Sequence, residues 1–187
     1  MTNRLRRVFL TAGLLLAAWA TLAPAIAEQP APLPVGYLEL NDDPRYAARK
    51  AYARIGLQSR MRPYPGAELG IKDTAMIASV AGTRLALDRI TGDDGTALVG
   101  AIKQALTDRG IHYFLMDLPE AIARAVTAGT QGMDVLLFNI SEGSNALRGT
   151  ECARQMIHIY PSLRMKTDAL SQYLRIRAWG KVLLLTG

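Results

Sequence analysis

The apolar residues of the chain gather in short runs that are typical of buried β-strands. The middle runs are almost continuously apolar, which is the pattern of strands that are covered on both faces. Six such runs predict strands, at residues 35–40, 83–90, 111–118, 134–140, 157–160 and 181–186.

Between these runs, apolar residues recur at the three- and four-residue spacing of amphipathic helices. Helices are predicted from Gly66, Gly95 and Pro119, and over residues 165–179. The first helix is expected to carry Leu69, Met76, Ile77 and Val80 on one side, and the last to turn Leu170, Tyr173 and Leu174 inward. The last five strands begin 28, 23, 23 and 24 residues apart. This regular repeat predicts an α/β fold, with a parallel sheet, right-handed crossovers and helices on both faces.

The N-terminus has the pattern of a secretory signal. An uncharged apolar run over 8–22 precedes Ala25-Ile26-Ala27, a small-x-small site that predicts cleavage before Glu28. The positive residues before the run are Arg4, Arg6 and Arg7. Residues 1–27 are therefore expected to direct export to the periplasm, with no stable membrane anchor retained. Arg6-Arg7 leaves both the general and the twin-arginine route open. Residues 28–34 form a Pro-rich lead.

Charge and cysteine content narrow the class of protein. Without residues 1–27, which hold three of the 22 basic residues and none of the 16 acidic ones, the net charge is +3. This small net positive charge argues against a nucleic-acid partner. Cys152 is the single cysteine, so no internal disulfide is expected, and its side chain is predicted to be inert and partly buried.

One stretch is locally very basic. Residues 45–62 contain six basic residues and no acidic one, within a long connection over 41–65 that follows the first predicted strand. Long connections in compact domains are usually functional or without fixed structure. The stretch could be a solvated surface helix, a nucleic-acid arm, or the mouth of a site for an anion.

Motifs for catalysis are missing from the sequence. It has no phosphate-binding G-x-x-x-x-G-K-S/T, no H-E-x-x-H, no C-x-x-C, and no G-x-G-x-x-G after a strand. Ser141, Gly143 and Ser144 do not form the G-x-S-x-G elbow of hydrolases. His112 and His158 have no second ligand at metal spacing, which favours structural roles. The sequence therefore predicts no enzyme, no metal and no cofactor.

Polar residues follow the predicted strands at the edge where open α/β sheets bind ligands. Asn41 and Asp42 follow the first strand, Asp117 ends the third, and the segments 139–149 and 160–162 follow the fourth and fifth. A solvent turn with helix-capping serines is the alternative interpretation of 139–149.

The order of elements, together with several segments, resembles a known family. The segments are NDDPRYAARKAYARIGLQSR, RPYPGAEL, FLMDLP and DVLLFNISEGSNALRGTEC. Over residues 35–187 the chain is similar to the first lobe of type I periplasmic substrate-binding proteins of ABC importers. More narrowly, it resembles the subgroup associated with pyrroloquinoline-quinone-dependent alcohol oxidation. The resemblance implies a first ligand-binding lobe over 35–180, a transporter permease as partner, and 181–187 as the start of a second lobe that is missing, so that the lobe is truncated.

The resemblance also implies a site. Asp117, Asn139, Ser141, Ser144 and Tyr160 match ligand-lining positions of the family. From the basic stretch and its end we add Arg54, Arg60, Arg62 and Tyr64, because arginine binds carboxylates in a bidentate fork and tyrosines can stack on a flat ring.

The sequence-based hypothesis for function follows. The chain is expected to be the periplasmic solute-binding component of an ABC-type importer, for an anionic aromatic small molecule such as pyrroloquinoline quinone, bound as a transported ligand and not as a cofactor. An extracytoplasmic sensory or interaction domain, or a non-functional fragment of a binding protein, are the alternatives.

Overall fold

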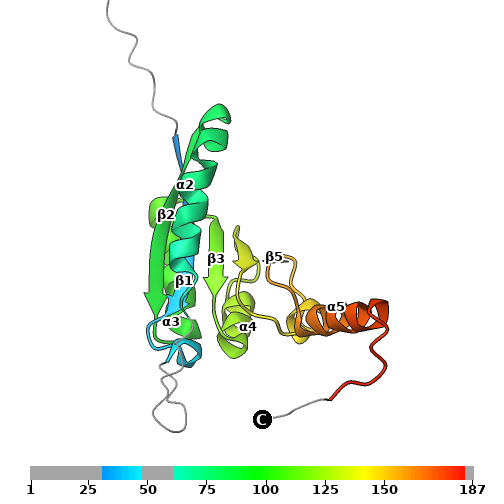
Figure 1. The fold of residues 1–187 in the computed structure, drawn as a ribbon. Helices are drawn as coiled ribbons and strands as arrows, with labels where there is room; N and C mark the ends of the chain where they lie inside the picture. The colour runs from blue at the N-terminus through cyan, green and yellow to red at the C-terminus, as the bar shows by residue number, and fades with distance from the viewer. Residues whose placement is uncertain (1–30, 48–60, 184–187) are drawn as a thin grey trace, which may run out of the picture. The chain divides into compact units, whose positions relative to one another are not determined.

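A computed structural model describes residues 31–47 and 61–183 (Figure 1). The predicted signal peptide over 1–27, the predicted site residues Arg54 and Arg60, and residues 184–187 lie outside the described residues.

The described chain contains a five-stranded parallel sheet with strand order β2-β1-β3-β4-β5. The strands are β1 (Ala31–Leu40), β2 (Thr83–Gly92), β3 (Tyr113–Asp117), β4 (Leu136–Asn139) and β5 (Met156–His158). Five of the predicted strands are thus confirmed. The sixth is wrong over its described part, because Lys181, Val182 and Leu183 belong to no strand.

The first strand begins earlier than predicted and takes in part of the Pro-rich lead. Pro32 and Pro34 pair only with β2, since the ladder to β3 begins at Val35. Proline has no N–H to give to a ladder, so it is tolerated where a strand has a neighbour on one side only. The Pro-rich composition of residues 31–34 therefore did not reveal that they form part of a strand with one neighbour.

Within residues 31–47 and 61–183, four helices connect or follow the strands: α2 (Tyr64–Val80), α3 (Gly95–Arg109), α4 (Glu120–Gly129) and α5 (Leu163–Ile176). Asp94 starts α3 by accepting a hydrogen bond from the Ala97 N–H over 2.8 Å, and Gly110 ends it in the left-handed conformation at φ 61°. The described parts of the longer connections contain the short 3-10 turns η1 (Pro44–Tyr46) and η3 (Ala146–Arg148).

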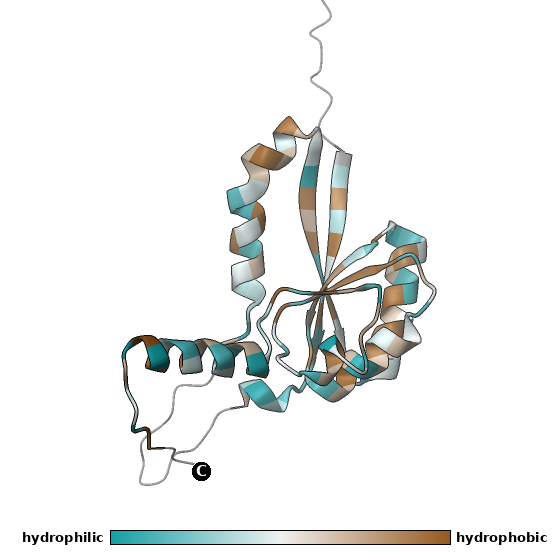
Figure 2. Ribbon diagram, turned by 90° about the vertical axis from the view of Figure 1, so that its right-hand side faces the viewer, coloured by the Kyte–Doolittle hydropathy of each residue, from teal (hydrophilic) through white to brown (hydrophobic). Residues whose placement is uncertain are grey.

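The main hydrophobic core lies between the sheet and the pair α3 and α4. Leu38, Phe114 and Leu137 of the strands pack there with Leu98 of α3 and Val126 of α4, and all five are buried. Helix α2 lies on the opposite side of the sheet, so both faces carry helices as predicted (Figures 1 and 2).

The face that carries α2 is only partly covered, which corrects two predictions. Helix α2 contacts the sheet through a different face from the one predicted. Leu69, Met76, Ile77 and Val80 are exposed, while Ala78 is buried. In α5 no residue is buried, and Leu170 and Tyr173, which were expected to face inward, are 58% and 51% exposed. A helical repeat identifies an apolar stripe but not the surface that covers it. No helix in the described part of the chain is long and apolar enough to span a membrane.

Candidate functional site

The carboxyl ends of β1, β3 and β4 meet around the carboxylate of Asp117, the last residue of β3. Asp117 is fully buried and accepts three hydrogen bonds: from the Tyr37 hydroxyl over 3.2 Å, the Tyr46 hydroxyl over 2.7 Å and Arg45 Nη2 over 3.0 Å. Burial, followed by the charge of Asp117, raises the pKa of the Tyr37 phenol well above its ordinary value. Tyr37 therefore stays a neutral donor to Asp117.

Arg45 joins these strand ends to each other. Its Nε and Nη2 donate to the Asp43 carboxylate, with the shortest distance 2.6 Å, and its Nη1 donates to Ser141 Oγ over 3.0 Å. Asp43 also caps η1 by accepting from the Arg45 backbone N–H over 2.9 Å. One guanidinium thus contacts residues that follow β1, end β3 and follow β4.

The pKa values of this pair reflect strong mutual stabilisation. Burial opposes the charge of Asp43, but hydrogen bonds from the side chain and backbone of Arg45 hold the pKa of Asp43 below its usual range. Burial likewise lowers the pKa of Arg45, and this is outweighed by the hydrogen bond with Asp43 and the charges of Asp117 and Asp43, which raise it. Both groups remain ionised at neutral pH.

A second charged cluster centres on Glu39 of β1, which is 1% exposed. Arg62 Nη1 donates to Glu39 over 2.9 Å and to the Leu40 carbonyl over 2.8 Å, and Arg89 Nε donates to Glu39 over 2.5 Å. The Arg89 guanidinium also lies 4.7 Å from the ring centre of Tyr64. Arg62 and Tyr64, both predicted site residues, therefore belong to the same edge of the sheet as Arg45.

The charges of the two clusters balance. The three guanidinium groups of Arg45, Arg62 and Arg89 face the three carboxylates of Asp43, Asp117 and Glu39. A shallow depression of about 430 Å³ lies beside them, and its lining is Asn41, Asp42, Asp43, Pro44, Tyr46, Ala47 and Arg62. Every buried side-chain nitrogen or oxygen of the described residues has a hydrogen-bond partner.

The predicted residues of the loop after β4 divide into two kinds. Ser141 faces the site through Arg45. Asn139 is buried and supports the loop, because its side-chain amide bonds both the N–H and the carbonyl of Glu142, over 2.9 and 2.8 Å. Ser144 is also buried, and its Oγ accepts from the Ala146 N–H over 3.2 Å. Asn139 and Ser144 thus hold the loop in shape.

Tyr160 lies at the corner between β5 and α5. Its carbonyl accepts a hydrogen bond from Arg148, and its hydroxyl accepts one from Lys166 Nζ over 2.6 Å. Five residues at this edge were not among the predicted site residues: Glu39, Asp43, Arg45, Tyr46 and Arg89. The adjacent Asp-Pro-Arg in the sequence is the signal that was present, since an Asp two residues before an Arg can both cap the turn and pair with the guanidinium.

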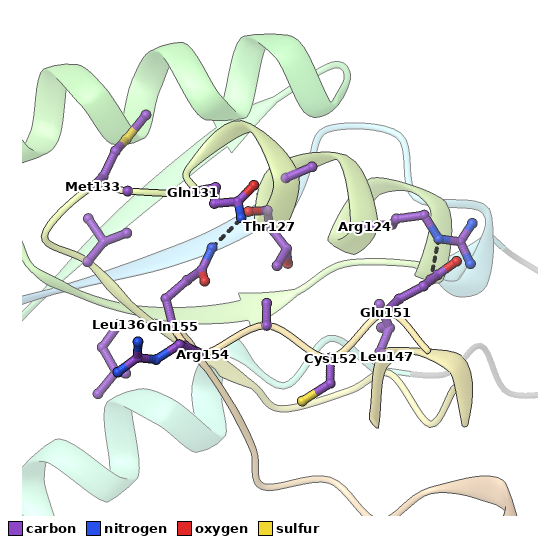
Figure 3. Close-up of a pocket in the computed structure, with 14 residues that line it drawn as sticks. Arg124, Thr127, Gln131, Met133, Leu136, Leu147, Glu151, Cys152, Arg154 and Gln155 are labelled. Atoms are coloured by element: carbon purple, nitrogen blue, oxygen red, sulfur yellow. Dashed lines mark hydrogen bonds and ion pairs between the residues drawn. The ribbon is translucent and has the colours of Figure 1, made fainter. Parts of the chain in front are cut away.

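A larger depression, of about 790 Å³, lies away from this edge, beside α4 and the amino end of β4 (Figure 3). It exists where the connection from β4 to β5 carries only the three-residue turn η3 in place of a full helix. Two interactions span it: Arg124 pairs with Glu151, and Gln155 donates to the Thr127 carbonyl over 2.9 Å. Cys152 lines it and is exposed, so the prediction of a partly buried thiol is wrong.

Comparisons with known proteins give structural matches only. No protein-family profile matches the chain, and no curated protein matches it in sequence. A possible leucine/isoleucine/valine-binding protein of Rhodopirellula baltica is similar in structure with a TM-score of 0.51 and 16% identity, over 82% of this chain and 38% of that protein. The fold of this chain is thus similar to the fold of part of that binding protein.

Two further solved structures agree. A leucine-, isoleucine-, valine-, threonine- and alanine-binding protein of Brucella ovis matches with a TM-score of 0.54 and 16% identity, over 79% of this chain and 37% of that one. An ABC transporter substrate-binding protein of Desulfitobacterium hafniense matches with a TM-score of 0.50 and 14% identity, over 79% and 39%. The predicted fold class is confirmed, and the chain spans less than two fifths of the length of each of these proteins.

The described residues offer no site for a metal ion. They contain no group of three or more His, Cys, Asp or Glu side chains placed to hold one. His112 Nδ1 bonds the Asp134 carbonyl over 2.8 Å, and His158 bonds Asn139 and the Leu147 carbonyl over 3.0 and 3.1 Å. Both histidines thus have structural partners.

Proposed function

We propose that this domain is a solute-binding lobe of an exported ABC-type receptor, and that it binds a small molecule at the carboxyl edge of its sheet. The observation that carries the proposal is the position of Arg45, which contacts Asp43, Asp117 and Ser141 at the ends of three strands. Open α/β sheets bind their ligands at this edge. The names of the structurally similar proteins, which describe amino-acid and substrate binding, support the same class of function.

The ligand that we propose is anionic and aromatic, and pyrroloquinoline quinone is the compound to test. Arg62 and Tyr46 both line the depression at the edge, with the Arg62 guanidinium 5.2 Å from the ring centre of Tyr46, so a guanidinium and an aromatic ring lie on one wall. Arg62 already donates to Glu39 and to the carbonyls of Leu40 and Asn41, and a carboxylate of the ligand would be a further acceptor. Arg45 already neutralises Asp43 on that wall. The exposed carboxylate of Asp42 is the group that an anionic ligand has to avoid, and a ligand with an ammonium group would instead use it.

Calorimetry on the chain without residues 1–27 tests both the proposed solute-binding function and the proposed ligand. Pyrroloquinoline quinone and leucine are titrated separately into the wild type, Arg62→Ala and Arg62→Lys. Loss of a charge-assisted hydrogen bond is expected to weaken quinone binding by about 2 kcal/mol in Arg62→Ala, less at high salt. Arg109→Ala is the matched control, because Arg109 forms an exposed ion pair with Asp88 in another part of the sheet.

The outcomes distinguish a wrong choice of ligand from a wrong proposal of function. Binding of leucine without binding of the quinone removes the anionic aromatic ligand and leaves a solute-binding lobe. Binding of neither, or equal quinone affinity for the wild type and Arg62→Ala, argues against recognition at this edge.

A sensory or interaction domain is the competing proposal. In that case the same edge contacts a membrane receptor, and not the permease of an importer. Genes for a permease and an ATPase beside this one favour import, whereas a neighbouring histidine kinase gene favours sensing.

A further inference from the structure

The sheet face that carries α2 has an apolar groove beside that helix. Its volume is about 460 Å³. Ala67, Gly70, Ile71 and Thr74 of α2 form one wall. The floor consists of Leu33, Val35, Tyr113, Leu115 and Phe138 of the sheet and of Ile159, which follows β5.

The groove is open to solvent, which is unusual for a parallel sheet. Strands of parallel sheets are normally covered on both faces. Here Tyr113, Ile157 and Ile159 are 38%, 44% and 62% exposed on strands β3 and β5 and just after β5. Contiguous exposed apolar surface of this kind marks a place where another element or another chain docks.

Helix α5 has the complementary surface. Leu163, Leu170 and Leu174 follow each other at helical spacing, with Tyr173 beside them, and no residue of this helix is buried. Apart from its first turn, α5 projects from the rest of the domain (Figures 1 and 2). The described part of the chain therefore contains both an apolar groove that is open to solvent and an amphipathic helix in which no residue is buried.

Hydrogen bonds at the start of α5 hold the helix in a direction in which it does not contact the groove of the same chain. The buried Ser162 caps the helix, the Leu163 N–H donates to the Gly143 carbonyl over 2.9 Å, and the Arg164 N–H donates to Asn145 Oδ1 over 3.1 Å. Ile159, which lines the groove, is separated from α5 by three residues only. Docking within one chain requires that these bonds break, whereas docking between two chains leaves them intact.

We propose that the groove receives α5 of a second copy of this chain, and that two copies exchange their α5 helices reciprocally. Such an exchange is isologous, because each copy presents both the groove and the helix. The groove shares no residue with the Arg45 and Glu39 clusters, so the inference does not depend on the proposed function.

Cross-linking between differently tagged chains tests the exchange. Both chains carry Cys152→Ser, which removes the exposed native thiol. One chain carries Ile71→Cys in the groove and the other Leu170→Cys on α5, and a short bifunctional maleimide is added to the mixture. The expected product contains one chain of each kind. A chain with both cysteines that cross-links only within itself, or no cross-link at all, overturns the exchange.

Molar mass measured by light scattering supplies an independent readout. The wild type is expected to be a dimer and Leu170→Glu a monomer, since a buried carboxylate on the apolar stripe opposes docking. Gln172→Glu, on the opposite side of α5, is the matched control and is expected to remain a dimer. Circular dichroism checks that both variants are folded. A monomeric wild type, or a dimer that Leu170→Glu does not dissociate, overturns the proposal.

Discussion

Arg45 donates a hydrogen bond to Asp117 over 3.0 Å, although the two residues are 72 positions apart in the chain. The Asp117 carboxylate is fully buried, and the same guanidinium also holds the buried Asp43. A single cation thus compensates two carboxylates that are removed from water. The proposed ligand edge consequently depends on this residue for its stability as well as for its shape.

Arg45→Met is expected to destabilise the domain strongly. Removing one partner of a buried ion pair leaves an uncompensated charge and typically costs about 3–5 kcal/mol. Arg109→Met is the matched control, because Arg109 and Asp88 form an ion pair in which both side chains are more than a third exposed, and such pairs contribute about 1 kcal/mol or less. Urea denaturation gives both free energies of unfolding. Similar losses for the two variants would show that Arg45 does not compensate buried charge.

The free energy of unfolding is expected to fall as the pH drops below about 6.5, because His158 is protonated more readily in the unfolded chain than in the folded one. Burial, followed by the charge of Arg148, lowers the pKa of His158 from its ordinary value of 6.5. The Asn139 amide explains why the neutral form is required. Its Nδ2 donates to the Glu142 carbonyl and also faces His158 Nδ1 over 3.0 Å. A proton on Nδ1 would therefore face the N–H groups of the Asn139 amide, and two donors would meet without an acceptor.

The sign of this effect follows from proton binding. Between the lowered pKa and 6.5 the unfolded chain binds a proton that the folded chain does not, so acidification favours unfolding. Urea denaturation between pH 5 and 7.5 is the measurement. His158→Gln should flatten the dependence in this window, and His112→Gln should retain it. An unchanged slope in His158→Gln assigns the dependence to other groups.

The sequence predicted the fold because its local signals agreed with one another. Apolar runs predicted β1 to β5, and helical spacing predicted α2 to α5. The exposure of α5 could not be predicted, because Leu170 and Tyr173 define an apolar stripe without indicating whether another surface covers it. The same limit applies to α2, whose exposed residues are as apolar as those that contact the sheet.

The candidate site was predicted in part. Asp117, Ser141 and Arg62 were predicted, and they lie with Arg45 at one edge. Arg45 was one of six cations in a basic stretch, and the signal that distinguishes it, Asp43 two residues before it, was not used in the prediction. The pairing of Glu39 with Arg62 and Arg89 joins residues 23 and 50 positions apart, so it is fixed by the tertiary fold and not by a local pattern.

Gly36→Ala is expected to disrupt the packing of β1 on β3. A Cβ at Gly36 would lie 2.5 Å from Phe114 Cδ1, and Phe114 is fully buried in the core. Overpacking of this kind costs about 1–3 kcal/mol. Gly100→Ala is the control, since a Cβ there meets nothing within 4 Å and alanine favours the helix by about 0.5–1 kcal/mol. Thermal unfolding should move in opposite directions for the two variants. Adding Phe114→Leu to Gly36→Ala should restore part of the loss.

In the loop after β4, Ser141 is expected to affect ligand binding and Ser144 to affect stability. Ser141 accepts from Arg45 over 3.0 Å, so Ser141→Ala should weaken binding of the proposed solute several-fold. Ser144 accepts from the Ala146 backbone N–H over 3.2 Å, so Ser144→Ala should lower the free energy of unfolding by about 1 kcal/mol. Calorimetry and urea denaturation on both variants separate the two effects.

The same pair of variants tests whether Ser144 is instead a hydrolytic nucleophile. A serine nucleophile needs a base within hydrogen-bond reach. His158, the histidine near this loop, has its ring nitrogens against Asn139 and the Leu147 carbonyl, over 3.0 and 3.1 Å. The hydroxyl of Ser144 is therefore expected to be unreactive. Ester hydrolysis by the wild type that disappears in Ser144→Ala and persists in Ser141→Ala would replace the binding proposal with an enzymatic one.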